Sequence, residues 1–117
     1  MKVISSLSIP PSPVTQEGAK AATIRELITD REGAPTFAMR LFEVAPGGAT
    51  PFHTHGCEHE VFVLEGEGQV KTREGPAAIK AGDAVFVPPN EEHQFANTGE
   101  QMMKFLCMIP VEQPCCR

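Results

Sequence analysis

The sequence has no tryptophan, no tyrosine and only four histidines among its 117 residues. The lack of tyrosine excludes catalysis by a phenolic acid or base. No apolar run approaches the roughly 18 residues of a membrane-spanning helix, and serines and Pro10 interrupt the N-terminal stretch MKVISSLSIPPSP, which makes it a poor secretory signal. A net charge of −5 argues against a nucleic acid or an anionic membrane as the main partner. We therefore expect a cytoplasmic protein with neither partner.

Cysteine is also scarce, and its four copies form no C-x-x-C pair. Cys115 and Cys116 are adjacent, which disfavours an ordinary disulfide framework, and reduced thiols fit a cytosolic protein.

Helical periodicity is missing as well, because eleven prolines and ten glycines cut the chain into short segments. Most segments between the turn signals have the composition of strands. The expected strands are Thr23–Ile28, Thr36–Val44, Glu60–Leu64, Gln69–Arg73, Ala77–Lys80, Ala84–Val87, Glu92–Ala96 and Met102–Ile109. Strands at this spacing predict an antiparallel sandwich or barrel. We expect one all-β domain at residues 21–112, an N-terminal arm at 1–20 and a C-terminal tail at 113–117.

Two glycine-containing segments are expected to form turns between these strands. Ala45-Pro46-Gly47-Gly48 should end the strand that begins at Thr36. Gly66-Glu67-Gly68 has the G-x-G spacing of a dinucleotide loop, but no helix follows it, so a hairpin turn is the better interpretation.

Three of the four histidines fall within HTHGCEHE, residues 53–60. Residues two apart in a strand point to the same face, so His53 and His55 should lie side by side, and His59 shares their parity. Neighbouring imidazoles are well placed to bind a divalent metal such as manganese, iron, nickel, copper or zinc. The fourth histidine, His93, lies in GDAVFVPPNEEHQFAN.

These two segments resemble the paired motifs of the cupin superfamily. The first family motif, G-x5-H-x-H-x(3,4)-E-x6-G, is matched by Gly47, His53, His55 and Gly66. The second, G-x5-P-x-G-x2-H-x3-N, is matched by Gly82, Pro88, His93 and Asn97. Asn90 replaces the second motif's inner glycine, and asparagine tolerates left-handed backbone angles. The resemblance implies a jelly-roll barrel, also described as a double-stranded β-helix.

The acidic ligand of the first motif is ambiguous in this chain. Glu60 has the right spacing from His55, whereas counting back from Gly66 leads to His59. Consecutive strand residues face opposite ways, so only one of the two can face a metal, and parity favours His59. The segment also resembles a small single-domain cupin branch with four histidine ligands, often manganese-bound. We therefore predict a site of His53, His55, His59 and His93, with three histidines plus Glu60 as the alternative.

Four neutral ligands would leave the full 2+ charge of the metal in place, which favours polarisation of a carbonyl or carboxylate over dioxygenase-like chemistry without excluding either. Manganese or iron is the favoured cofactor, and a closed tetrahedral zinc site is the structural alternative. Arg40 and Cys107 are the candidate catalytic residues: Arg40 could bind a substrate carboxylate, and the resemblance at MRLF and FLC supports both. A surface arginine and an inert buried cysteine are the simpler interpretations.

Three functions are compatible with these residues. The chain could be a metal-dependent enzyme acting on a small-molecule substrate, a non-catalytic binding or sensor cupin, or a metal-free structural or sugar-binding barrel, which the complete ligand set disfavours. The fold does not choose between the first two. The extended arm also favours a homodimer.

Overall fold

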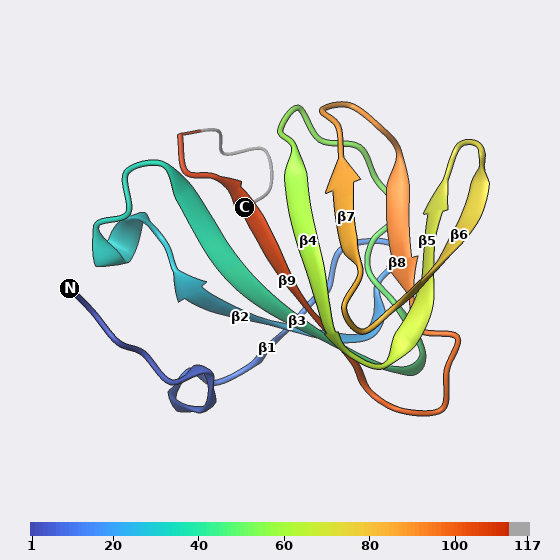
Figure 1. Cartoon of the computed structure of the whole chain (residues 1–117), viewed down its shortest axis with the longest axis horizontal. Coiled ribbons are helices and arrows are strands. Elements are labelled where there is room, and N and C mark those ends of the chain that lie inside the picture. Colours follow the sequence, from blue (N-terminus) through green and yellow to red (C-terminus); the bar gives the residue numbers. More distant parts are fainter. Residues whose placement is uncertain (113–117) are drawn as a thin grey trace.

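The computed structural model describes residues 1–112, so the expected tail at 113–117, with Cys115 and Cys116, lies outside the described residues. The described chain is almost entirely β-structure (Figure 1). Its strands are β1 Ser12–Pro13, β2 Lys20–Ile28, β3 Phe37–Ala49, β4 His59–Glu65, β5 Glu67–Thr72, β6 Gly75–Lys80, β7 Ala84–Val87, β8 His93–Ala96 and β9 Met103–Pro110. Two short 3-10 helices, η1 Ser6–Ser8 and η2 Asp30–Glu32, complete it. The expected single all-β domain is confirmed, and every strand predicted from Thr23 onward is present.

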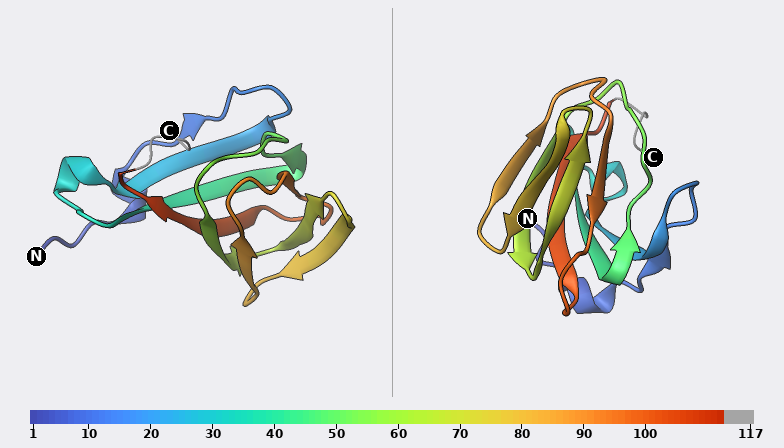
Figure 2. Two further views of the ribbon diagram at one scale, coloured as in Figure 1. Left: turned by 90° about the horizontal axis from the view of Figure 1, so that it is seen from above. Right: turned by 90° about the vertical axis from the view of Figure 1, so that its right-hand side faces the viewer.

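All strand pairs are antiparallel, in the order β6-β5-β8-β3-β9-β4-β7, with β2 on the other side of β3 and β1 beside β2. The sheet curls over itself, as the two views of Figure 2 show. Side chains on its inner face form one apolar core that includes Val44, Val63, Met103, Phe105 and Ile109. No helix within residues 1–112 has the length and apolar character needed to cross a membrane.

The turn predicted at residues 45–48 is wrong, because β3 continues through this segment to Ala49. Ala22 faces Val44 in the β2–β3 register, but Lys20 faces Ala49, so the Pro-Gly-Gly segment forms a bulge. A Cβ atom on Gly48 would lie 2.6 Å from the Lys20 carbonyl oxygen, which explains the need for glycine. The bulge lets the end of β3 leave β9 and pair with β8.

The hairpin predicted at Gly66 is also wrong. β4 pairs with β7 and β9, whereas β5 pairs with β6 and β8, so the two strands are not hydrogen-bonded to each other. Gly66 has a φ of +82° and forms the corner where the chain passes between these two parts of the sheet. A Cβ atom there would lie 2.6 Å from the Met102 carbonyl oxygen.

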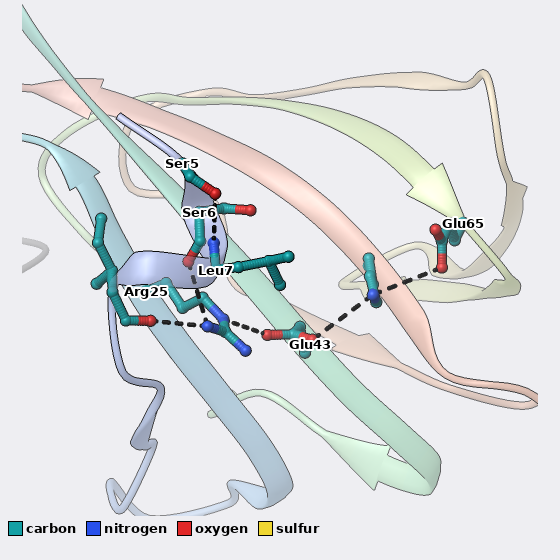
Figure 3. Close-up of polar contacts among 8 residues, drawn as sticks. Ser5, Ser6, Leu7, Arg25, Glu43 and Glu65 are labelled. Carbon is teal, nitrogen blue, oxygen red and sulfur yellow. Dashed lines mark hydrogen bonds and ion pairs between the residues drawn. The ribbon is translucent and has the colours of Figure 1, made fainter. Parts of the chain in front are cut away.

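The N-terminal arm packs along β2 and is held there by Arg25 (Figure 3). The Arg25 guanidinium donates to the carbonyl oxygens of Ser6 and Ile9, at 3.2 and 2.7 Å, and forms an ion pair with Glu43 at 2.7 Å. Further along the arm, the backbone N–H of Val14 donates to the Ala22 carbonyl at 2.9 Å. The arm is therefore fixed at two points before it reaches the turn into β2.

Candidate metal centre

The two histidine segments run side by side and are joined by backbone hydrogen bonds. His53 and His93 form an isolated antiparallel bridge, with N···O distances of 3.2 and 3.1 Å. Asn97 is joined to the Gly47–Gly48 bulge in the same way. The Gly47 N–H donates to the Asn97 carbonyl at 3.1 Å, and the Asn97 N–H donates to the Gly48 carbonyl at 3.0 Å. His53 and His55 lie in the connection between β3 and β4 rather than in a continuous strand, which corrects that expectation, and the bridge supplies the support that a strand would give.

Asn90 closes the turn before β8 in the left-handed conformation expected for it, with a φ of +68°. Its backbone N–H donates to the His55 carbonyl at 2.6 Å. The replacement of the family's glycine by asparagine therefore preserves the turn and ties it to the histidine segment.

The structure brings the four predicted histidines together. Nitrogen atoms of His53, His55 and His93 all lie within 4.8 Å of one another, an arrangement that could hold a metal ion. The Nε2 atoms of His53 and His55 are 2.7 Å apart. The ring of His59 lies beside them, with its centroid 5.0 Å from that of His93 and 5.2 Å from that of His55.

Neighbouring residues in β4 face opposite sides of the sheet. His59 is only 4% exposed and lines the cavity described below, whereas Glu60 is exposed on the outer face. Burial and the adjacent Glu58 carboxyl raise the pKa of Glu60 to about 7. The geometry thus brings His59, and not Glu60, alongside the other imidazoles.

The imidazoles of His53 and His59 are held in their neutral form, the form that donates a lone pair to a metal. Burial, followed by His55 and His93, lowers the pKa of His53 from 6.5 to about 4. Burial, followed by His93 and Arg40, lowers the pKa of His59 to about 3. Neutral, clustered imidazoles fit a divalent transition metal, because they need not lose protons at neutral pH before binding it.

A cavity of about 260 Å³ opens above this cluster. Its lining consists of Pro13, Val14, Thr15, Gln16, Ile24, Glu26, Arg40, Phe42, Thr50, Pro51, His53, His55, His59, His93, Phe95, Phe105 and Cys107. The arm residues 13–16 and Glu26 were not predicted from the sequence. Nothing in the arm marks it as a cavity wall, because its position depends on pairing with β2.

Both candidate catalytic residues lie in this cavity. Arg40 is 6% exposed, with its guanidinium carbon 5.1 Å from the centre of the Phe42 ring. The free cysteine Cys107 is buried and accepts a hydrogen bond from Arg40 Nη2 at 3.1 Å. A surface position for Arg40 is thereby excluded. Cys57 is buried and disulfide-bonded, so the expectation of reduced thiols is wrong at that position.

The fold and this site define the class of protein. The cupin domain family model matches residues 40–109, and the chain belongs to that family. An oxalate-binding protein from Thermotoga maritima is 31% identical over 112 residues, with 92% of each chain covered. A 1-methylthio-D-xylulose 5-phosphate methylsulfurylase from Rhodospirillum rubrum is 33% identical over 78 residues, which span 67% of this chain and half of that protein.

Solved structures agree with this assignment. The polyketide cyclase RemF from Streptomyces resistomycificus superposes with a TM-score of 0.90 at 36% identity, covering 97% of this chain and 82% of that one. A predicted oxalate decarboxylase from Thermotoga maritima gives a TM-score of 0.84 at 26% identity, covering 94% and 99%. The jelly-roll fold expected from the histidine motifs is confirmed.

Proposed function

We propose that this chain is a metal-dependent enzyme in which His53, His55, His59 and His93 hold one divalent transition metal, and that a small anionic organic molecule is transformed beside it. The observation that carries the proposal is the gathering of all four imidazoles in a cavity that also contains a buried guanidinium, that of Arg40. Such a cavity suits a ligand with two neighbouring oxygen atoms and a negative charge.

Manganese or iron is the cofactor we favour among manganese, iron, nickel, copper and zinc. When bound, the metal supplies a Lewis acid that polarises a carbonyl or carboxylate oxygen. Glu60 lies on the outer face, so a four-histidine site keeps the full 2+ charge, which favours this chemistry over dioxygenase-like oxidation.

The residues of the chain bind and orient the substrate. Arg40 donates hydrogen bonds to its anionic oxygens, which increases the charge complementarity of the cavity. The rings of Phe42, Phe95 and Phe105, which pack on one another with centroid distances of 5.2 and 4.8 Å, take the apolar part of the substrate and exclude water. Cys107, the second candidate residue, lies beside this guanidinium, with its Sγ atom 3.1 Å from Arg40 Nη2.

Two of the relatives support the substrate class. The names of RemF and of the Thermotoga maritima protein refer to polyketides and to oxalate. Both are carbonyl-rich molecules that can present two oxygens to one metal ion. We propose a diketone or a carboxylate of this kind as the substrate.

A non-catalytic binding cupin is the second candidate, because the relative named for oxalate binding matches nearly the whole chain. Incubation of metal-loaded protein with diketones and dicarboxylates, under air and under nitrogen, separates the alternatives. Consumption under both gases supports Lewis-acid chemistry, and consumption under air alone supports a dioxygenase-like reaction. Calorimetric binding without turnover indicates the binding protein. Loss of turnover in Arg40→Gln at saturating metal would support the role of the guanidinium.

We also propose a cytoplasmic homodimer with no nucleic-acid or membrane partner. Phe62, Leu64 and Phe86 are 41, 42 and 60% exposed on β4 and β7, and an apolar surface of this kind supports contact with a second subunit. Sedimentation at micromolar concentration should give a dimer, and Phe62→Lys should give a monomer. A strictly monomeric wild-type protein would contradict the proposal.

A further inference from the structure

One sulfur atom joins the guanidinium and an imidazole inside the cavity. Cys107 Sγ lies 3.1 Å from Arg40 Nη2 and 3.1 Å from His59 Nδ1. The three side chains come from β3, β9 and β4, which are neighbours in the sheet, and Cys107 pairs with Arg40 in the β3–β9 register. All three are at least nine-tenths buried.

We propose that Cys107 is a positioning residue, whose sulfur accepts hydrogen bonds from both Arg40 and His59 and thereby orients the anion-binding group and one metal ligand together. The inference rests on the proposed metal site, because it concerns the residues that serve that site. It assigns Cys107 a positioning role in place of a direct catalytic one, and inert packing of the buried thiol is the alternative that substitutions can test.

The histidine tautomers support this assignment. The Nδ1 atom of His93 lies 2.9 Å from the Glu91 carbonyl oxygen, which can only accept, so Nδ1 carries the proton and Nε2 has the free lone pair. In His59 the same nitrogen faces Cys107 Sγ, which has lone pairs to accept a hydrogen bond. Two cavity histidines are therefore held through Nδ1, one by a carbonyl and one by a thiol. Such partners fix the tautomer and ring orientation of metal-binding histidines.

Packing and positioning predict opposite rankings of two substitutions. Valine keeps the apolar bulk of the cysteine but removes the acceptor, whereas serine is smaller and keeps it. If Cys107 only fills space, Cys107→Val should resemble the wild type more closely than Cys107→Ser. If it positions Arg40 and His59, the order is reversed.

The first measurement needs no metal. The ¹⁵N-edited NMR spectrum of the histidine rings in metal-free protein should show His59 protonated at Nδ1 in the wild type and in Cys107→Ser. In Cys107→Val this preference should be lost, while His93, held by Glu91, should keep it. An unchanged His59 tautomer in Cys107→Val would overturn the proposal. If the valine variant does not fold, Cys107→Ala takes its place under the same criterion.

The second measurement compares metal and anion binding. In competition with a chelator, Cys107→Val should bind Mn²⁺ about 10–100-fold more weakly than wild type, the usual effect of removing a partner of a metal ligand, and Cys107→Ser should retain most of the affinity. At saturating metal, Cys107→Val should also bind oxalate more weakly, because Arg40 is no longer oriented. Ile109→Val, a matched core change two residues further along β9, should change neither affinity.

Tighter metal binding in Cys107→Val than in Cys107→Ser would overturn the inference. Failure of the wild type to bind any divalent metal would instead refute the proposed function, and the NMR comparison would still decide the role of Cys107. The two failures are therefore distinguishable.

Discussion

The backbones of His53 and His93 exchange two hydrogen bonds, with N···O distances of 3.2 and 3.1 Å. This bridge joins the segment before β4 to the start of β8, so two histidines distant in sequence share one side of the cavity. The site therefore depends on the conformation of both connecting loops as well as on the strands. The turn at Asn90 is the most direct test of that dependence.

The effect of replacing Asn90 on stability should depend on how well the new residue tolerates the left-handed backbone conformation. Asn90→Gly should retain the wild-type stability, whereas Asn90→Val should lose roughly 1–2 kcal/mol, the cost of a left-handed residue with a Cβ branch. Chemical denaturation of the metal-free variants gives both values. Equal stability of the two variants would show that the backbone relaxes without strain.

Acid should destabilise the metal-free protein through its histidines. The folded-state pKa values of His53 and His59, about 4 and about 3, lie below the unfolded value of 6.5. The unfolded chain therefore binds more protons than the folded protein below pH 6.5. The stability that these two neutral histidines contribute is complete above pH 6.5 and is lost as the pH falls towards 3. Each histidine contributes a slope of at most about 1.4 kcal/mol per pH unit. Urea denaturation in chelator from pH 7.5 to 4 should show a shallower slope for His59→Gln than for wild type, and equal slopes would contradict the assignment.

Glu60 should act in the opposite direction. Its folded-state pKa of about 7 lies above the unfolded value of 4.5. The contribution of Glu60 to the free energy of unfolding is therefore complete below pH 4.5 and is lost as the pH rises through 7. Glu60→Gln should therefore gain stability relative to wild type between pH 5 and 8, by no more than about 1 kcal/mol because the side chain is exposed. Glu58→Gln is the matched variant, because removing that carboxyl should lower the pKa of Glu60. A pH-independent difference between Glu60→Gln and wild type would refute the interaction.

Close packing at the corner between β4 and β5 should make Gly66 far less replaceable than Gly75. Both have positive φ angles, +82° and +112°, but only a Cβ on Gly66 would meet backbone atoms, at 2.6 Å from the Met102 carbonyl oxygen. Gly75→Ala should cost roughly 1–2 kcal/mol from the left-handed conformation alone, and Gly66→Ala should cost about 1–3 kcal/mol more because of overpacking. Thermal unfolding of the two variants measures the difference. Similar costs would mean that the corner can open without a penalty.

Strand positions and the facing of side chains could be predicted from the sequence, because alternation depends only on neighbouring residues. It separated His59 from Glu60, which the structure buries and exposes respectively. For Arg40 the sequence left a surface position open, and the structure buries the side chain. Pairing between distant segments could not be predicted in this way. At the bulge of Gly47–Gly48 and the corner of Gly66, the backbones of Lys20 and Met102 lie too close for a side chain, and glycine alone does not distinguish a bulge or a corner from a turn.

The contacts that the site residues make with other side chains could not be predicted from the sequence either. The contact of Cys107 with His59 joins strands that are distant in the chain, and the arm lines the cavity only because Arg25 and β2 hold it in place. The motif spacing predicted which histidines meet. It did not predict what orients them.

Metal content after replacement of two neighbouring residues in β4 tests the central claim most directly. Wild-type protein and Glu60→Gln are loaded with Mn²⁺ and dialysed against a weak chelator. Each should retain about one ion per chain by elemental analysis, since the four histidines form a single metal site. His59→Ala should retain far less, because one of the four proposed ligands is gone. Full retention in His59→Ala together with loss in Glu60→Gln would contradict the four-histidine site.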